Sequence, residues 1–269
     1  MDSLSSYGSK KLKRESTSTR RNATNLFGQR ATMIYRTSLN IGHDGSTSAH
    51  VHDLMGCATL ASTKERAISK LESTIPDYYR WLRSNGERIP AVRNPKATII
   101  EEIRTQGSAG EAGGSDPLFS CDRIKCTHVD ISRCLQLLNY TRADLDKIIS
   151  KIPTEELDWR PRSEPRSIRN VLEHIAQVDI WYLSRIRADP RLERNRMKDV
   201  FEFLDYARSL VHEVLPRLTA EQRSRTFRPK KWSESPWPWT ATKVLHRLVG
   251  HERQHMHYLQ RILWVHDNH

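Results

Sequence analysis

Apolar residues recur at the three- and four-residue spacing of amphipathic helices throughout the second half of the chain. This spacing predicts four helices, and no strand pattern interrupts them. The first opens at Thr127-x-x-Asp130 and the second begins near Ser167. We therefore expect an all-α four-helix bundle over residues 128–269. The predicted helices cover about 130–152, 167 to before 189, 197–218 and 241–264.

The preceding segment, residues 33–104, has a different pattern, because apolar and polar positions alternate in short runs bounded by turn residues. A capping box at Ser62-x-x-Glu65 then opens a helix that extends to about Arg83. Pro76 lies inside that helix and should kink it or begin a second segment. The predicted strands are 33–41, 48–51, 57–60 and 97–103. The fold class expected for the whole chain is α+β multidomain, with a small βββαβ domain followed by the helical bundle.

Two segments carry few large apolar residues. Residues 1–32 are rich in Ser, Thr, Lys and Arg, with seven basic and two acidic residues, and are predicted to be a disordered basic tail. Residues 105–127 begin with a Gly/Ser-rich run and are predicted to be a linker at a domain boundary. The net charge of the chain is +12, and positive charge is densest in this tail. Nucleic-acid binding is therefore only weakly suggested, and by the tail alone.

Cysteine usage and hydropathy indicate a compartment. The four cysteines, at 57, 121, 126 and 134, form no C-x-x-C pair, and no secretory signal core is visible. A reducing, cytoplasmic location is therefore expected. The mean hydropathy of −0.69 and the lack of a long apolar run argue against a membrane partner. Cys121, Cys126 and His128 could be imagined as a zinc cluster, but their spacing is unusual and no fourth ligand is evident.

The strongest chemical signal is His251-Glu-Arg-Gln-His255 in the fourth predicted helix. Histidines four residues apart lie on the same helix face, and here they occupy the apolar stripe where Leu or Ile is expected. Buried polar groups are costly without partners, so the pair is either hydrogen-bonded in the core or binds a metal. His246 and His257 fall away from the stripe and are expected to face solvent.

Two further residues bear on this choice. The letters also match the zinc-protease pattern H-E-x-x-H, in which Glu252 would be the general base and a third ligand would follow downstream. Glu252 lies at the edge of the stripe, so that role stays open. His174, in the second predicted helix, lies at the edge of that helix's apolar face. It is a plausible third ligand, although a lone histidine there is more often a hydrogen-bonded boundary residue.

Residues 33–104 resemble the HicB-like family of small antitoxin-type domains. The resemblance is carried by Asp53-Leu-Met-Gly-Cys57, by Thr63-x-Glu65-x-Ala67 and by Gly86-Glu-x-Ile-Pro90. Met55 replaces the usual proline of the family, and Arg66-Ala67 offsets its usual Glu-Ala pair by one position. Complete antitoxins of this kind continue into a small DNA-binding module. No such module is apparent here.

Residues 128–265 resemble the DinB/YfiT-like superfamily of metalloenzymes. The resemblance is carried by Leu157-Asp-Trp-Arg-Pro161, by Ser167-Ile-Arg-x-Val-Leu-x-His-Ile-Ala176, by Trp181-Tyr-Leu183 and by His251-x-x-x-His255. It implies that His174, His251 and His255 bind one divalent metal ion, Zn or Ni. Zinc–nitrogen bonds of about 2.0–2.1 Å would place the ligand nitrogens roughly 3–3.5 Å apart.

Three protein ligands leave a coordination position open for water or for a thiol. The resemblance therefore implies a metal-dependent hydrolase or a thiol transferase that acts on an unidentified small molecule, and a chain that pairs as a homodimer. It assigns no catalytic residue and no organic cofactor. The alternative is a non-catalytic regulatory protein, in which the HicB-like domain contacts a toxin-like or RNA partner and the bundle is a scaffold.

Overall fold

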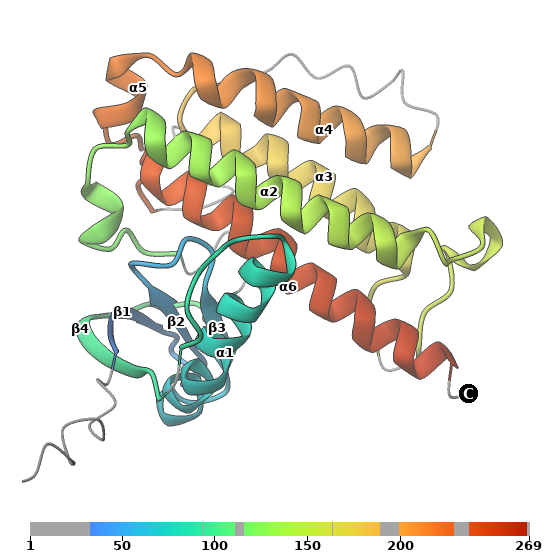
Figure 1. Ribbon diagram of the computed structural model, residues 1–269, viewed down its shortest axis with the longest axis horizontal. Coiled ribbons are helices and arrows are strands. Elements are labelled where there is room, and N and C mark those ends of the chain that lie inside the picture. Colours follow the sequence, from blue (N-terminus) through green and yellow to red (C-terminus); the bar gives the residue numbers. More distant parts are fainter. Residues whose placement is uncertain are drawn as a thin grey trace, which may run out of the picture. The chain divides into compact units, whose positions relative to one another are not determined.

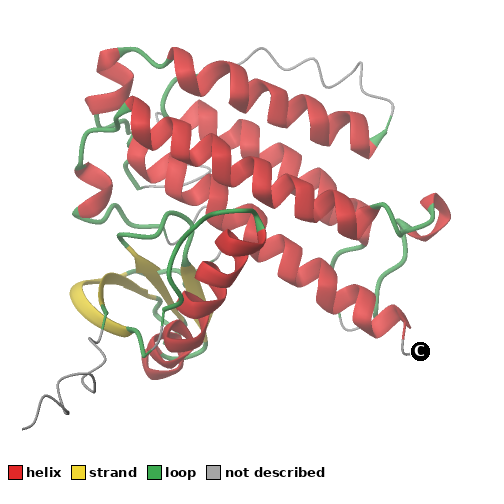
Figure 2. Cartoon of the chain, viewed as in Figure 1, coloured by secondary structure: helices red, strands yellow, loops and turns green. Residues whose placement is uncertain are grey.

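The computed structural model describes residues 33–92, 94–110, 116–162, 164–188, 199–228 and 237–267. Within these ranges a small mixed sheet with one helix is followed by a helical region (Figures 1 and 2). Residues 32–269 form one compact unit in their contacts. The domain boundary that the sequence suggests at 105–127 stays a prediction, and the predicted disordered tail, 1–32, lies outside the described residues.

The sheet has four strands in the order β3-β2-β1-β4. The first three strands are antiparallel neighbours, whereas β4 returns parallel to β1 after the crossover through the helix α1, with a register shift between Thr37 and Ser38. The predicted order of three strands, a helix and a fourth strand is therefore present. The strands are β1 (Ile34–Ile41), β2 (Thr47–Val51), β3 (Ala58–Ala61) and β4 (Lys96–Arg104).

Helix α1 (Lys64–Ser84) covers the sheet with its apolar face. Its N-cap is Thr63, whose hydroxyl accepts a hydrogen bond from the Arg66 amide, so the cap predicted at Ser62 is one residue too early. The helix continues through Pro76, with Ile75 and Tyr78 buried on either side of the proline, so no second segment begins there. The buried face consists of Ala67, Leu71, Ile75, Tyr78 and Leu82.

The helical region contains the four predicted long helices. It also contains one short helix, α5, between the third and fourth of them, which the sequence pattern did not predict. Capping boxes at Thr127 and Ser167 begin the first two long helices. Short 3₁₀ turns, among them η1 (Cys121–Arg123), join several of the elements. The helices are α2 (His128–Ile149), α3 (Ile168–Arg185), α4 (Val200–Val214), α5 (Ala220–Ser224) and α6 (Ala241–Asp267).

Helix α6 also contacts the sheet region. Gly56, in the turn after β2, has a φ of +76°, and a Cβ built on it would lie 2.5 Å from Cγ1 of Val249 and 2.9 Å from the Gly250 nitrogen. Only a glycine allows this approach. The turn therefore rests on α6 immediately before His251.

A buried group of charges joins the segment before η1 to the same helix. The Asp116 carboxylate accepts two hydrogen bonds from Arg247, at 3.0 and 2.8 Å, and the Asp116 carbonyl accepts one from the Lys243 ammonium at 2.6 Å. Arg247 and Lys243 outweigh the effect of burial and lower the pKa of Asp116 to about 2. This part of the predicted linker is thus tied to α6 by ion pairs.

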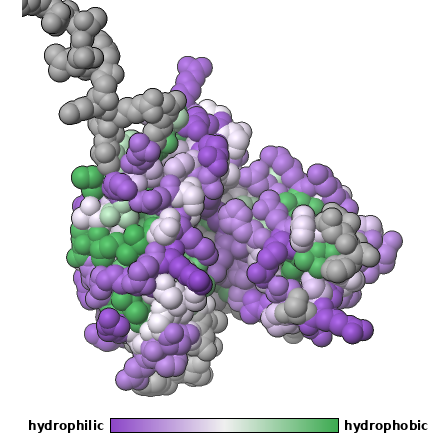
Figure 3. All heavy atoms as spheres, turned by 90° about the horizontal axis from the view of Figure 1, so that it is seen from below, coloured by the Kyte–Doolittle hydropathy of each residue, from purple (hydrophilic) through white to green (hydrophobic). Residues whose placement is uncertain are grey.

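The exposed surface is largely hydrophilic, but apolar side chains reach it at the sheet. Ile34 on β1 and Ile100 on β4 are 66% and 48% exposed, and Figure 3 shows an apolar area over this part of the molecule. No helix in the described part of the chain is both long and apolar enough to cross a membrane.

The contact at Gly56 gives a first prediction. Gly56→Ala should lower the free energy of unfolding by about 3 kcal/mol, because the added methyl meets Val249 and the backbone is left-handed. Gly86 has a φ of +88°, and a Cβ added there would meet no atom within 4 Å, so this position isolates the backbone effect. Gly86→Ala should cost only about 1–2 kcal/mol. Urea unfolding measures both values, and equal losses would refute the close contact with α6.

Candidate metal centre

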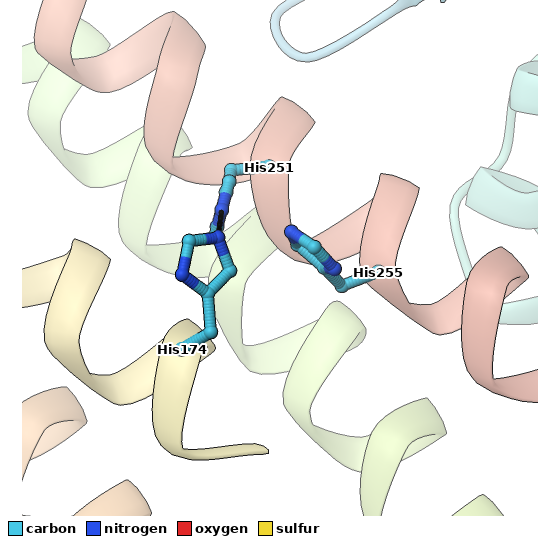
Figure 4. A group of neighbouring side chains, drawn as sticks. All are labelled: His174, His251 and His255. Atoms are coloured by element: carbon cyan, nitrogen blue, oxygen red, sulfur yellow. Dashed lines mark hydrogen bonds between the residues drawn. The ribbon is translucent and has the colours of Figure 1, made fainter. Parts of the chain in front are cut away.

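Three histidines from two helices converge in the helical region. His174 lies on α3, in the second turn after the Ser167 cap, and His251 and His255 lie one turn apart on α6. Helices α3 and α6 pack against one another, which brings residues 77 positions apart in the sequence face to face (Figure 4). These three residues form the one group of potential metal ligands that the described part of the chain brings together.

The geometry of the group suits a single ion. Nε2 of His174 lies 3.2 Å from Nε2 of His251, within the spacing expected of nitrogens that share one zinc ion. The three ring centroids are 4.4–5.0 Å apart, and one nitrogen from each ring lies within 4.8 Å of the other two. The rings point toward a common point between the helices (Figure 4).

The surroundings of the histidines favour neutral imidazole, the form that binds metals. Burial lowers the pKa of His174 to about 4 and that of His255 to about 3. Burial also lowers the pKa of His251, and the other two histidines add to the effect. The positive charge of Arg166, which precedes α3, disfavours protonation of all three rings. At neutral pH each ring therefore offers an unprotonated nitrogen.

One buried atom in the group lacks a hydrogen-bond partner. Nδ1 of His255 is buried and has no such partner among the described residues. A buried polar atom without a partner costs about 1–3 kcal/mol. The donor set itself, three imidazole nitrogens from three neighbouring rings, fits a divalent metal ion.

Glu252, the residue after His251, points into a different environment. Its side chain is fully buried, and its carboxylate accepts hydrogen bonds from Arg208 at 2.9 Å and from Thr141. Arg142 approaches the other carboxylate oxygen at 3.4 Å. Both oxygens are thus engaged by other helices of the bundle. Glu252 is a core residue, and the H-E-x-x-H letters do not form a zinc-protease site here.

The contacts of Glu252 belong to a buried polar layer that joins all four long helices. Arg208 on α4 donates to Asp179 on α3 at 3.1 Å, to Glu252 on α6 and to the Leu138 carbonyl on α2 at 3.0 Å. Burial opposes the charged form of Arg208, but the charges of Asp179 and Glu252 outweigh it and raise its pKa. The side chains that make up this polar layer are Thr141, Arg142, Asp179, Arg208 and Glu252.

The polar layer was not predicted from the sequence. Its members lie on four different helices, and a single polar residue within one apolar stripe does not indicate which residues of other helices are its partners. The signal was present in Arg208, which lies between Leu204 and Val211 at positions where an apolar residue is expected. A buried arginine requires acidic partners, which would have pointed to Asp179 and Glu252.

The structure also bears on the expectations for the other histidines of α6 and for the cysteines. His257 is exposed, as expected, whereas His246 is only partly exposed and lines a surface pocket together with Asp53 and Leu54. Burial lowers the pKa of His246 to about 4. Cys121, Cys126 and His128 do not assemble into a metal-ligating group in the described part of the chain.

One comparison with known proteins matches a large part of the helical region. Residues 137–259 match the family model of the DinB superfamily, which supports the expected DinB-like domain. No curated protein matches the chain. Among solved structures, the chain is similar to YfiT from Bacillus subtilis, described as a probable metal-dependent hydrolase with an unusual four-helix bundle topology. That alignment has 18% sequence identity, a TM-score of 0.40, and covers 52% of this chain and 89% of that one. The HicB-like assignment of 33–104 stays a prediction.

The polar layer gives a second prediction. Arg208→Met should lower the free energy of unfolding by about 3–5 kcal/mol, because it leaves the buried Asp179 carboxylate without its cation and Glu252 with only the more distant Arg142. The matched control is Arg217→Met, since Arg217 is 75% exposed and pairs with Glu213 on the surface. That control should cost about 0.5 kcal/mol or less. Similar losses for both variants in urea unfolding would contradict the assignment of Arg208 to a buried network.

Proposed function

We propose that His174, His251 and His255 bind one divalent metal ion, with Zn or Ni as the preferred candidates, and that the protein is a metal-dependent enzyme. The observation that carries the proposal is the convergence of three neutral, partly buried imidazoles from α3 and α6. Imidazole nitrogen suits both of these ions. The match of residues 137–259 to the DinB superfamily supports the same conclusion.

Each residue of the centre has a defined role in this proposal. His251 and His255 hold two positions from one face of α6, and His174 holds the third from α3. No other histidine, cysteine or carboxylate of the described residues joins the group, so further coordination positions are left for small molecules. A metal ion held by three protein ligands would supply Lewis-acid activation of water or of a thiol.

The reaction class that follows is hydrolysis or thiol transfer on a small molecule. Both need an electrophile positioned next to an activated nucleophile, and the three-histidine set accommodates either. Arg166 adds a positive charge near the histidines, and that charge would favour substrates with an anionic group close to the reacting atoms. Assays on metal-loaded protein with a panel of esters and amides, and in parallel with thiols and electrophilic acceptors, would distinguish the two reactions.

Two further expectations belong to the same proposal. The four cysteines are free, and three of them are buried, which is consistent with a reducing compartment such as the cytoplasm. Homodimer formation, and a regulatory role of residues 33–104 with a toxin-like or RNA partner, stay predictions without an observation in their favour.

The test of the proposal is metal stoichiometry. Purified protein, or protein refolded with Zn and Ni, should retain about one equivalent of metal by elemental analysis. His251→Ala should reduce this to near zero, because two ligands hold the ion far more weakly than three. His257→Ala is the matched control, since His257 lies on the same helix but is exposed. Absence of metal from the refolded protein would refute the proposal, and so would equal metal retention by His251→Ala and His257→Ala.

A further inference from the structure

A second polar site lies at the end of the helical region that carries α5 (labelled in Figure 1), where the segment after η1 is hydrogen-bonded to that helix. Four arginines line an open pocket of about 430 Å³ there, and none of its lining residues in the described part of the chain is acidic. We call this cavity the arginine pocket. Its six lining residues are Arg123, Arg187, Arg225, Thr226, Phe227 and Arg228.

The charge of the arginine pocket is largely uncompensated. Arg225 forms an ion pair with Glu221, one helical turn earlier. Arg123, Arg187 and Arg228 have no acidic partner among the described residues, and all four arginines are exposed. Guanidinium groups that line one pocket repel each other, so an anion bound there would reduce this electrostatic repulsion.

Hydrogen bonds hold the three segments that carry these arginines in place. The Cys126 amide donates to the Arg223 carbonyl at 3.0 Å, which ties the segment after η1 to α5. The Gln222 side-chain amide donates to the Arg187 carbonyl at 3.3 Å, which ties α5 to the turn that ends α3. Arg187 adopts a left-handed backbone, with a φ of +55°, in that turn. Few non-glycine residues do so, and in general such strain is found where surrounding contacts impose it.

Phe227 lies beside two of the guanidinium groups. Its ring is 5% exposed, and the Cζ atoms of Arg187 and Arg225 each lie 5.8 Å from the ring centroid. The backbone of Phe227 pairs with that of Trp239 through two hydrogen bonds, at 2.7 and 2.8 Å, immediately before α6. The two guanidinium groups therefore lie near the same buried ring, at the outer limit of cation–π distance.

We propose that the arginine pocket binds the phosphate group of a small phosphate monoester. Guanidinium groups donate paired hydrogen bonds that match phosphate oxygens, and a dianionic monoester carries more charge for three unpaired arginines than a singly charged carboxylate or phosphodiester. The cavity volume admits a small molecule. The site is separate from the three histidines and shares no residue with them.

The test is calorimetric titration of the full-length chain with inorganic phosphate and with glycerol phosphate, at constant ionic strength. Arg187→Gln and Arg228→Gln should each weaken phosphate binding by about tenfold, because each removes charge-assisted hydrogen bonds. Arg104→Gln is the matched control, since Arg104 is an exposed arginine at the end of β4 and lies outside the pocket. It should leave the affinity unchanged.

Two further arms separate the pocket from other anion sites. His251→Ala should retain phosphate binding, whereas loss of binding in that variant would place the anion at the histidines and overturn the proposal. A single-stranded oligonucleotide serves as the phosphodiester probe and should not compete with glycerol phosphate. The proposal also fails if phosphate does not bind, if Arg104→Gln weakens binding as much as Arg187→Gln, or if the oligonucleotide alone binds in an Arg187-dependent way.

Discussion

The contact on which the helical region depends is the buried ion pairing of Arg208 with Asp179 and Glu252. Two clusters of buried apolar residues lie on either side of this polar layer along the helices. The first includes the sheet residues and Trp239, and the second is a separate core of the helical region. On α6, for example, Val249 belongs to the first core and Met256 to the second, with Glu252 between them. A shared guanidinium satisfies carboxylates that would otherwise be costly to bury. Because Arg208 on α4 contacts α2, α3 and α6 at once, the layer joins the four long helices at one level along their length.

The position of the three histidines follows from that alignment. Glu252 and His251 are consecutive on α6, so fixing the carboxylate against Arg208 also fixes the adjacent imidazole. Asp179 and His174 are five residues apart on α3, and the same arginine holds that helix. The centre therefore needs few contacts of its own. Its main polar contact within the described residues is the approach of His174 to His251, and its rings are held by the helices that carry them.

Local signals in the sequence predicted the four strands and the long helices, but not the short helix α5 or the contacts between the elements. The capping residues Thr127 and Ser167 predicted two helix starts, because a cap depends on neighbours within one turn. Spacing alone revealed His251 and His255, whereas His174 was assigned through family resemblance. Arg208 and the Gly56 contact were missed, since their partners lie far away in the chain and no periodicity records them. The start of α1 was misplaced by one residue, because Ser62 and Thr63 are both good caps and the difference between them is small.

The adjacency of Glu252 and His251 has a consequence for how this chain can vary in length. A residue inserted into α6 between the sheet contact at Gly250 and the second core would rotate everything after it by about 100°. The Glu252 carboxylate, the His255 imidazole and the apolar side chains of the second core would then all point away from their partners. An insertion in a turn between two helices would not rotate the residues of either helix in this way. Insertions and deletions among homologues should therefore accumulate between the helices, and the segment from Gly250 to Met256 should keep a constant length.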